Sequence, residues 1–391
     1  MSTREAVIVS AVRTPVGRCR GVLASVPAHI LGAAVVKEAV RRSGIDPSLI
    51  DDVIFGNLMN NEINNMGRMV ALEADLPVSV PGITLDRQCA ASLNALAYGA
   101  IQIMAGFGDI IVAGGVESDS RRTYSLEKCD SAYSVMPPKF VDIHTAPDRI
   151  GHVTMGVTAE NVAAKYGFTR EELDAFSVRS HKLATAAWDK GLFNEQLVPI
   201  EVKGKHGKVT TVARDESVRA DCTMESLAAL RPCFRKDGIV TAGNSSPMSD
   251  GAGAMVIMER GLAEKAGLEI LGVFRSYAAA GVDPNVMGLG PVAAVAKLMK
   301  RTGLNVSDID LWELNEAFAS QSLGCIRDIG MDIEKVNPNG GALAMGHPLA
   351  GTGAILTAKT VYEMKRRDLH KAVITFCVGG GQGVAVLLER D

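Results

Sequence analysis

The chain carries one order of structural patterns twice. An apolar strand, a helical pattern and a second strand follow one another near the start, at 6–14, 28–44 and 53–58. The same three patterns return in the second half, at 269–279, 292–303 and 311–318. In each copy the helix ends at a glycine, Gly44 or Gly303, which suits the left-handed turn that closes many helices. Because strands that alternate with helices favour the α/β class, we predict two similar α/β halves, each with a mixed sheet covered by helices.

The pattern breaks between the two copies. A charged helical segment at 169–191 and a hairpin-like stretch at 201–210 lie there. An insertion of this length is too long for a simple loop, and functional insertions often cover a site. The predicted organisation is an N-terminal half, a loop domain inserted into it that caps the site, and a C-terminal half, with bounds at 1–118 plus 245–268, 119–244 and 269–391.

Length, charge and cysteine spacing exclude several classes of protein. The chain has 391 residues and a net charge of −3, so nothing favours broad attraction to nucleic acid or an anionic membrane. No apolar run reaches the roughly 18–20 residues that span a bilayer, and the first residues lack the pattern of a signal peptide. The seven cysteines are widely spaced and odd in number, which does not fit a disulfide framework. We predict a cytoplasmic protein with reduced thiols.

Two cysteines have local contexts that suggest thiol chemistry. Cys89 immediately precedes a helical pattern, where unpaired N–H groups and the positive end of the dipole favour a thiolate, so we predict a lowered pKa. Cys377 ends an apolar strand and runs into three glycines. A thiolate there could act as a base at the α-carbon of an acyl thioester. The alternative for both is a small buried apolar side chain.

A histidine and an amide complete the candidate catalytic set. His347 is surrounded by glycines, which allow the backbone to approach a ligand closely, and its neutral imidazole could accept a proton from Cys89. Asn315 follows a strand and could hold a water that faces a thioester oxygen, or could serve only as a helix cap. The other histidines have no supporting context and are predicted to be surface or capping residues: His29, His144, His152, His181, His206 and His370.

The ordered motifs around these residues resemble those of the thiolase family, the acetyl-CoA acetyltransferases and 3-ketoacyl-CoA thiolases. The resemblance covers essentially the whole chain, and the sequences NEAFA, GHP and CVGGGQG carry it in that order. One departure is visible, because the family usually has serine two residues after the nucleophile. Here Ala91 occupies that place and Ser92 comes one residue later.

The resemblance implies roles for each catalytic residue. Cys89 would carry the acyl group and His347 would activate it, while Cys377 would move the proton of the second substrate. One oxyanion hole would use His347 and a water held by Asn315. The other would use the backbone N–H groups of Gly379 and Cys89. The implied reaction is a reversible Claisen condensation in fatty acid metabolism, with CoA as substrate and no metal or other cofactor. Homodimers or homotetramers are the implied assembly.

The family also implies a tunnel for CoA and the acyl group. Pantetheine would lie near Ser246, the nucleotide near Arg219 and Ser226, and the acyl group near two methionines. The full expected set is Ser246, Arg219, Ser226, Phe234, Ala242, Met155, Met287, Ala317 and Phe318. Ordinary alternatives apply: the methionines could be core filler, Arg219 a solvated charge and Ser226 a helix cap.

Two other functions stay open at this point. A ketosynthase-type condensing enzyme has related architecture, but such enzymes pair the cysteine with two histidines or with histidine and asparagine, whereas this chain has Cys377. A non-catalytic acyl-CoA-binding or scaffold protein draws support from Ala91. Zinc is disfavoured because the ligand spacings C-x-x-C and H-E-x-x-H are absent from the sequence.

Overall fold

The computed structural model describes residues 4–129, 131, 133, 136–151, 153–204 and 207–391. The strands are β1 (Ala6–Arg13), β2 (Gly17–Arg18), β3 (Asp52–Gly56), β4 (Gly82–Leu85), β5 (Ile110–Ser118), β6 (Ile200–Lys203), β7 (Val209–Val212), β8 (Ser249–Glu259), β9 (Gly272–Gly281), β10 (Leu311–Leu314), β11 (Lys371–Val378) and β12 (Gln382–Glu389). The α-helices are α1 (Ala28–Ser43), α2 (Met66–Glu73), α3 (Ala91–Ala105), α4 (Met155–Tyr166), α5 (Arg170–Asp189), α6 (Met224–Ala228), α7 (Arg260–Lys265), α8 (Gly290–Thr302), α9 (Ala319–Ile329), α10 (Ala342–Met345) and α11 (Thr352–Arg367). Short 3-10 helices are η1 (Pro47–Leu49), η2 (Asp119–Arg121), η3 (Asn194–Gln196), η5 (Pro284–Leu289), η6 (Val306–Asp308), η7 (Ile333–Lys335) and η8 (Leu349–Gly351).

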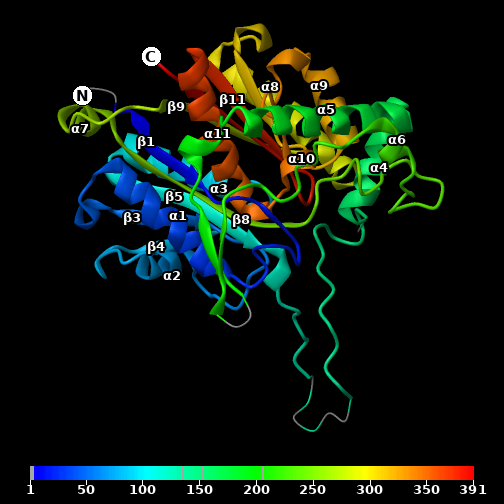
Figure 1. The fold of residues 1–391 in the computed structure, drawn as a ribbon, viewed down its shortest axis with the longest axis horizontal. Helices are drawn as coiled ribbons and strands as arrows, with labels where there is room; N and C mark the ends of the chain where they lie inside the picture. Colours follow the sequence, from blue (N-terminus) through cyan, green and yellow to red (C-terminus); the bar gives the residue numbers. More distant parts are fainter. Residues whose placement is uncertain (1–3, 130, 132, 134–135, 152, 205–206) are drawn as a thin grey trace.

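The two halves have the same strand pairing, as the sequence repeat predicts. In the first half β1 pairs antiparallel with β8, β8 antiparallel with β5, and β5 parallel with β3. In the second half β9, β12, β11 and β10 repeat this order and these directions. An antiparallel contact between β1 and β9 joins the halves into one sheet (Figure 1). Gly44 and Gly303 close α1 and α8 in the left-handed conformation, with φ of 69° and 73°.

Helices cover both faces of this sheet. Along β1, Ile8 packs on the side of α3 and α11, whereas Val7 and Val9 pack on the side of α1. The outer face of the second half is covered by α8 and α9. In α11 every residue from Thr352 to Met364 is buried, so this helix lies in the interior of the molecule beside α3 (Figure 1). The starts of these two inner helices carry the candidate catalytic turns.

The segment between β5 and β8 adds a layer beside the second half. Helices α4 and α5 contact α9, and α5 also contacts α10 and α6. The predicted hairpin is present as the antiparallel pair β6 and β7. Before α4 a long two-sided arm projects from the body (Figure 1), and backbone bonds from Glu127 N to Lys139 O and from Val141 N to Ser125 O join its sides.

A buried ion pair fastens this added segment to the first half. Arg13 and Asp215 are both buried and form a two-pronged contact, with Nη1 to Oδ1 at 2.8 Å and Nη2 to Oδ2 at 3.1 Å. Trp188 and Gln196 complete the surroundings, because the indole N–H donates to Asp215 and Arg13 Nε donates to Gln196 Oε1. Breaking a satisfied buried pair is costly.

Among the described residues, no helix is long and apolar enough to cross a membrane.

Candidate active site

The first candidate nucleophile lies at a tight turn before α3. Cys89 precedes the capping residue Ala90 of that helix, and Gln88 has a left-handed backbone with φ of 47°. Residues with a side chain rarely adopt positive φ, and such strain concentrates at functional turns. The N–H of Gln88 donates to Asp86 Oδ1 at 2.6 Å. This turn holds the Cys89 side chain half-buried against the inner core.

Burial controls the acidity of Cys89. Loss of hydration raises the pKa of its thiol to about 11, while N–H donation from Gly379 and from Cys89 itself opposes the rise. The charges of Glu117 and Asp86 raise the pKa further. The predicted lowering by the helix start is therefore wrong, because desolvation of the thiolate outweighs the local donors. At neutral pH the resting group is a thiol that needs a base.

The second cysteine interacts electrostatically with the first. Cys377 is fully buried near the end of β11. Burial raises its pKa well above the ordinary value, and negative charge on Cys89 raises it further. Since neighbouring like charges disfavour each other, the two sulfurs do not both ionise at neutral pH.

Asn315 lies at the same edge of the sheet as Cys377. It directly follows β10, which runs parallel to β11, and its N–H donates to Thr375 O at 3.0 Å. The next helix, α9, is capped at Phe318, so Asn315 is not a helix cap. Its Oδ1 is buried and has no protein hydrogen-bond partner among the described residues. The amide therefore offers an acceptor to a ligand in the site.

The hydrogen bonds around His347 define its tautomer. Thr352 Oγ1 donates to Pro348 O at 2.9 Å, so it accepts from His347 Nδ1 at 2.7 Å. This leaves Nε2 as the acceptor nitrogen, 3.3 Å from Asn315 Nδ2. Burial lowers the pKa of the imidazole to about 4. His347 is therefore neutral at pH 7, with Nε2 as its unprotonated nitrogen.

Close backbone contacts join the Cys89 turn to the His347 turn. Ser92 Oγ accepts the N–H of Ala354 at 3.0 Å. A Cβ at Gly353 would lie 2.3 Å from Leu93 N, so this position requires glycine. Ala91 is fully buried, and Ser92 serves the contact between α3 and α11. The replacement of the usual serine thus leaves a packed helix start.

A buried carboxyl group that the sequence analysis missed clamps the same turn. Glu117 is fully buried in β5 and accepts N–H groups from Met59 at 2.9 Å and from Ala350 at 3.3 Å. Burial raises its pKa to about 8, against the effect of these two donors. The sequence signal that could have revealed Glu117 is a carboxylate directly after the apolar residues of β5.

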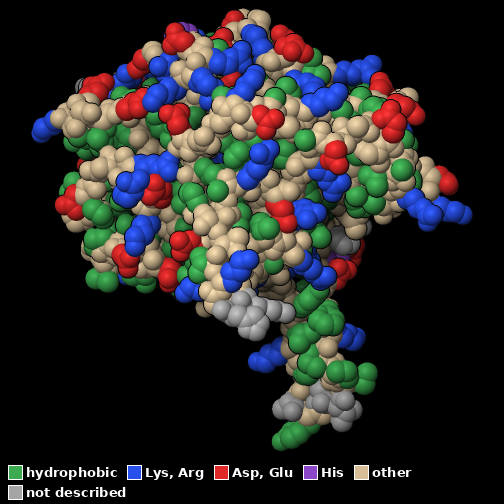
Figure 2. Space-filling model, in the orientation of Figure 1, with side chains coloured by type: hydrophobic (Ala, Val, Ile, Leu, Met, Phe, Trp, Pro, Cys, Tyr) green, Lys and Arg blue, Asp and Glu red, His purple; other side chains and the backbone are tan. Residues whose placement is uncertain are grey.

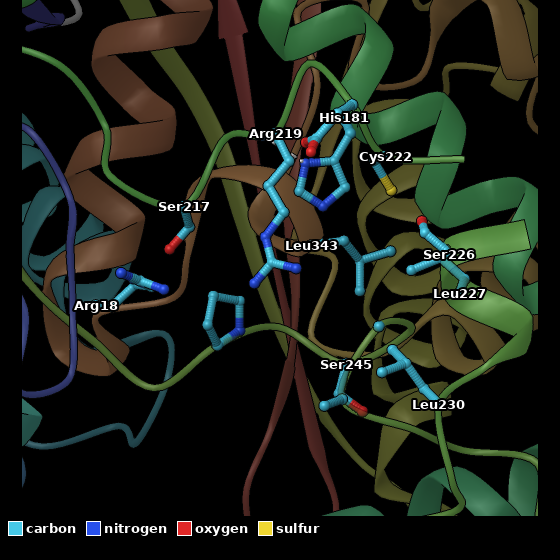
Figure 3. Close-up of a pocket in the computed structure, with 14 residues that line it drawn as sticks. Arg18, His181, Ser217, Arg219, Cys222, Ser226, Leu227, Leu230, Ser245 and Leu343 are labelled. Carbon is cyan, nitrogen blue, oxygen red and sulfur yellow. Dashed lines mark hydrogen bonds between the residues drawn. The ribbon is translucent and has the colours of Figure 1, made fainter. Parts of the chain in front are cut away.

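A cavity of about 260 Å³ lies beside the added segment. Three residues of the expected binding set line it, namely Arg219, Ser226 and Ala242. Figure 3 shows Arg219 extending into the middle of the cavity, with Ser226 on the α6 side. Ser226 is also part of a capping box with Thr223, so it both caps α6 and lines the cavity. The guanidinium of Arg18 also lines this cavity.

One histidine departs from its predicted surface position. His181 is buried in this cavity, its Nδ1 accepts the N–H of Arg219 at 3.2 Å, and burial lowers its pKa to about 4. The prediction for His181 is wrong, because α5 packs its face against the cavity. His144 and His370 are exposed and His29 is half-buried. His152 and His206 lie outside the described residues.

The remaining expected binding residues form an apolar wall near the thiols. Met155, Met287, Ala317 and Phe318 pack in one cluster with Cys377 and Leu343. Phe234 stands edge-on to Phe318, with ring centres 6.2 Å apart. Ser246 N donates to Ala317 O at 2.9 Å. Leu343 lines the cavity as well. The expected binding residues therefore form two groups, one lining the cavity and one in the apolar wall, and Leu343 lies in both.

Comparisons with known proteins agree over the whole chain. Residues 6–261 match the thiolase N-terminal domain and residues 268–390 the thiolase C-terminal domain. An acetyl-CoA acetyltransferase of Pseudomonas aeruginosa is 43% identical over 99% of this chain and 100% of its own length. A 3-ketoacyl-CoA thiolase of Bacillus subtilis is 45% identical, with 99% of each chain covered.

Solved structures agree in fold. The acetyl-CoA acetyltransferase of Bacillus anthracis superposes with a TM-score of 0.94 at 40% identity and 99% coverage of each chain. The human mitochondrial 3-ketoacyl-CoA thiolase in complex with CoA gives a TM-score of 0.93 at 36% identity, covering 100% of this chain and 98% of that one. The two matched domains together span nearly all of the sequence, and the chain belongs to the thiolase family.

Proposed function

We propose that this protein is an acyl-CoA C-acyltransferase that works through an acyl group on Cys89. It condenses acetyl-CoA with a second acyl-CoA, or in reverse cleaves a 3-ketoacyl-CoA with free CoA. The observation that carries this proposal is the combination of two thiols and one neutral imidazole in one site. Negative charge on the half-buried Cys89 acts on Cys377, and the neutral imidazole of His347 belongs to the turn before α11, which packs against the start of α3. Two such thiols can serve as one nucleophile and one base, whereas a ketosynthase has a single catalytic cysteine.

The first half-reaction loads the enzyme. His347 Nε2 takes the thiol proton as Cys89 Sγ attacks the thioester carbonyl carbon. The carbon–sulfur bond to CoA breaks, and the CoA sulfur takes the proton of the Cys377 thiol and leaves as free CoA. The Cys89 proton stays on His347 Nε2, and Cys377 is left as a thiolate. The N–H groups of Gly379 and Cys89, which donate to the Cys89 sulfur in the resting protein, would stabilise the oxyanion.

The second half-reaction forms the carbon–carbon bond. Cys377, as a thiolate, takes a proton from the α-carbon of the second acyl-CoA, and the carbanion attacks the acyl-Cys89 carbonyl. Cys89 leaves as a thiolate and regains its proton from His347, while Cys377 keeps the α-proton, so that all three groups return to their resting states. The protonated Nε2 of His347 and a water held by Asn315 would donate hydrogen bonds to the enolate oxygen of the second thioester.

The segment 119–244 is proposed as the CoA-binding domain between an N-terminal half of 1–118 plus 245–268 and a C-terminal half of 269–391. Arg18 and Arg219 supply positive charge for the phosphates, and Ser226 and Ala242 line the same cavity. Pantetheine would run past Ser246 to the apolar wall at Phe318. CoA is a substrate here, and no further cofactor enters these steps.

The enzyme is further proposed to act in fatty acid metabolism in the cytoplasm, as a homodimer or homotetramer. All seven cysteines are free thiols, which suits a reducing compartment. Apolar side chains crowd the projecting arm (Figure 2), and Tyr124, Leu126, Met136, Phe140 and Ile143 are each at least half exposed. Such a surface commonly marks a contact between chains. Gel filtration over a range of concentrations tests the assembly.

The deciding experiment is intact-mass spectrometry after brief incubation with acetoacetyl-CoA, followed by peptide mapping. One acetyl group on Cys89, removed by free CoA, is the expected result. Cys89→Ala should give no adduct and no turnover, while Cys129→Ala, a change at an exposed thiol on the projecting arm, should behave as the parent. Turnover by Cys89→Ala would contradict the proposal. A Cys89 that stays inert to every acyl-CoA and to iodoacetamide would favour a non-catalytic binding protein.

A further inference from the structure

The residue after Asn315 carries a carboxylate that takes no part in the proposed steps. Glu316 is fully buried, and three neutral groups donate hydrogen bonds to it. Ser180 Oγ donates to Oε2 at 2.6 Å, and Asn337 Nδ2 donates to Oε1 at 2.8 Å. The N–H of Leu343 donates to Oε2 at 3.3 Å. Because a buried carboxylate is costly unless donors satisfy it, these contacts fix the position of Glu316.

The three donors come from three separate segments of the chain. Ser180 lies in α5, Asn337 in the loop before α10, and Leu343 in α10. Ser180 Oγ also accepts the N–H of Gly341 at 3.0 Å. A Cβ at Gly341 would lie 2.2 Å from the carboxyl carbon of Glu316, so the backbone there packs directly against the carboxylate. Glu316 therefore joins the added layer to the start of α10.

The same contacts hold the backbone on both sides of Asn315. Before it, Asn337 Oδ1 accepts the N–H of Leu314 at 2.9 Å, and Asn337 Nδ2 donates to Leu314 O at 2.8 Å. After it, the same Nδ2 donates to Glu316. Asn337 has φ of 46°, a conformation that residues with a side chain keep only where contacts enforce it. The segment 314–316 is therefore clamped around Asn315.

The side chain of Asn315 depends on this clamp more than the imidazole of His347 does. His347 has anchors of its own, because its backbone N–H donates to Ser249 Oγ at 3.1 Å and its Nδ1–H donates to Thr352 Oγ1. Asn315 Nδ2 lies 3.3 Å from His347 Nε2, while Oδ1 has no hydrogen-bond partner in the described part of the chain. A shift of the segment 314–316 would therefore displace Oδ1 without releasing His347.

We infer that Glu316 is a positioning residue for the proposed reaction, and that it acts through Asn315. It holds the amide oxygen where a water, with one proton on Oδ1, can donate its other proton to the enolate oxygen. The inference rests on the proposed function and adds a residue to its carbon–carbon bond-forming half. The first half-reaction forms no enolate and does not need this water. Exchange of labelled CoA into acetyl-CoA reports that half alone and is therefore an internal control.

The first test is Glu316→Gln, read by cleavage of acetoacetyl-CoA, which passes through the same enolate in reverse. One amide oxygen replaces two carboxylate oxygens, so the three donors cannot all keep an acceptor and the segment 314–316 must shift. A misplacement of about 1 Å can cost about 100-fold in rate, so kcat should fall about 10-fold to 100-fold. CoA exchange should stay close to the parent. A parental kcat, or an equal fall in CoA exchange, would overturn the inference.

A double variant separates positioning from a general structural role. Asn315→Ala removes the amide through which Glu316 acts, so adding Glu316→Gln to it should lower kcat no further. Two independent effects would instead add in free energy and multiply in rate. A double variant that is slower than Asn315→Ala by the full factor of Glu316→Gln would overturn the inference.

Ser180→Ala tests the same clamp without changing the carboxylate, and it decides the question if Glu316→Gln does not fold. Loss of one donor should lower kcat about fivefold, from a net value of about 1 kcal/mol for one hydrogen bond. Ser177→Ala is the matched control, since Ser177 lies in the same helix, is equally buried, and donates to Leu173 O at 3.0 Å. In that case, parental kcat in Ser180→Ala, or an equal loss in Ser177→Ala, would overturn the inference.

Failure of the proposed function would look different. If the parent protein forms no acyl group on Cys89 and exchanges no CoA, the acyltransferase reaction is refuted and the role of Glu316 falls with it. If the parent exchanges CoA and cleaves acetoacetyl-CoA, but Glu316→Gln does both at parental rates, the reaction stands and only the role of Glu316 is refuted.

Discussion

Replacing Thr352 with valine should impair catalysis through its effect on His347 rather than through a lost substrate contact. In the parent enzyme Thr352 Oγ1 accepts a hydrogen bond from the Nδ1–H of His347 at 2.7 Å, which leaves Nε2 as the acceptor. Valine has nearly the same shape but no oxygen. The buried Nδ1–H then loses its acceptor, at a cost of about 1–3 kcal/mol, or the ring moves its proton to Nε2. In the second case Nε2 cannot accept the Cys89 proton, and it faces the N–H of Asn315 at 3.3 Å.

Either outcome raises the barrier by a similar amount. At about 1.4 kcal/mol for each tenfold change in rate, kcat/KM should fall roughly 5-fold to 150-fold. The loss should lie mainly in kcat, because Thr352 is placed to orient a base rather than to bind CoA. The acid limb of the pH profile should also move to lower pH, since the imidazolium form loses the oxygen that stabilises it.

Thr360→Val is the matched control. Thr360 lies on the same helix, is equally buried, and its hydroxyl also bonds back to the preceding turn, to Leu356 O at 2.7 Å. Both variants should lose similar thermal stability, whereas only Thr352→Val should lose activity. If Thr352→Val keeps kcat/KM within twofold of the parent, or if Thr360→Val loses as much, the tautomer argument is refuted.

Three further results follow from the buried groups. Alkylation of Cys89 by iodoacetamide should accelerate with pH up to about 11 rather than level off near 8.5; a plateau near neutral pH, read by peptide mapping, would contradict the burial argument. Glu117 has a folded-state pKa near 8 against an ordinary 4.5, so its contribution to stability is full below about pH 4.5 and is lost as pH rises through 8, by at most about 5 kcal/mol. Glu117→Gln should flatten that slope in urea unfolding measured at pH 5 and pH 8, and an unchanged slope would rule this out. Asp215→Ala leaves Arg13 buried without its partner and should cost about 3–5 kcal/mol, seen as a fall in Tm larger than that for Asp189→Ala, whose pair with Arg214 is exposed.

The repeat in the sequence predicts the fold well because it rests on local patterns. The left-handed glycines Gly44 and Gly303 and the strand and helix order follow from residues near one another in the chain. The pairing between β1 and β9 was not predictable in this way, since it depends on contacts between residues far apart in the chain, such as Ala6 with Phe274, 268 positions later.

The predictions for the site show the same contrast between local sequence patterns and contacts between distant segments. Glycine-rich turns and strand ends marked Cys89, His347 and Cys377, but their acidities depend on burial that arises only when distant segments pack. This is why the pKa of Cys89 moves opposite to the expectation from its helix. His181 shows the same limit, because its place in the cavity is set by the loop that carries Arg219.

The electrostatic coupling between the two thiols explains the order of the steps in the proposed mechanism. A thiolate at Cys377 is disfavoured while Cys89 carries negative charge. Acylation converts Cys89 into a neutral thioester, so this penalty disappears at the step in which Cys377 must act as a base. When the new carbon–carbon bond forms, Cys89 departs as a thiolate, but by then Cys377 has taken up the α-proton and is neutral. The two charges therefore never need to coexist, and a fully buried second cysteine can act as a base without a permanent cationic partner.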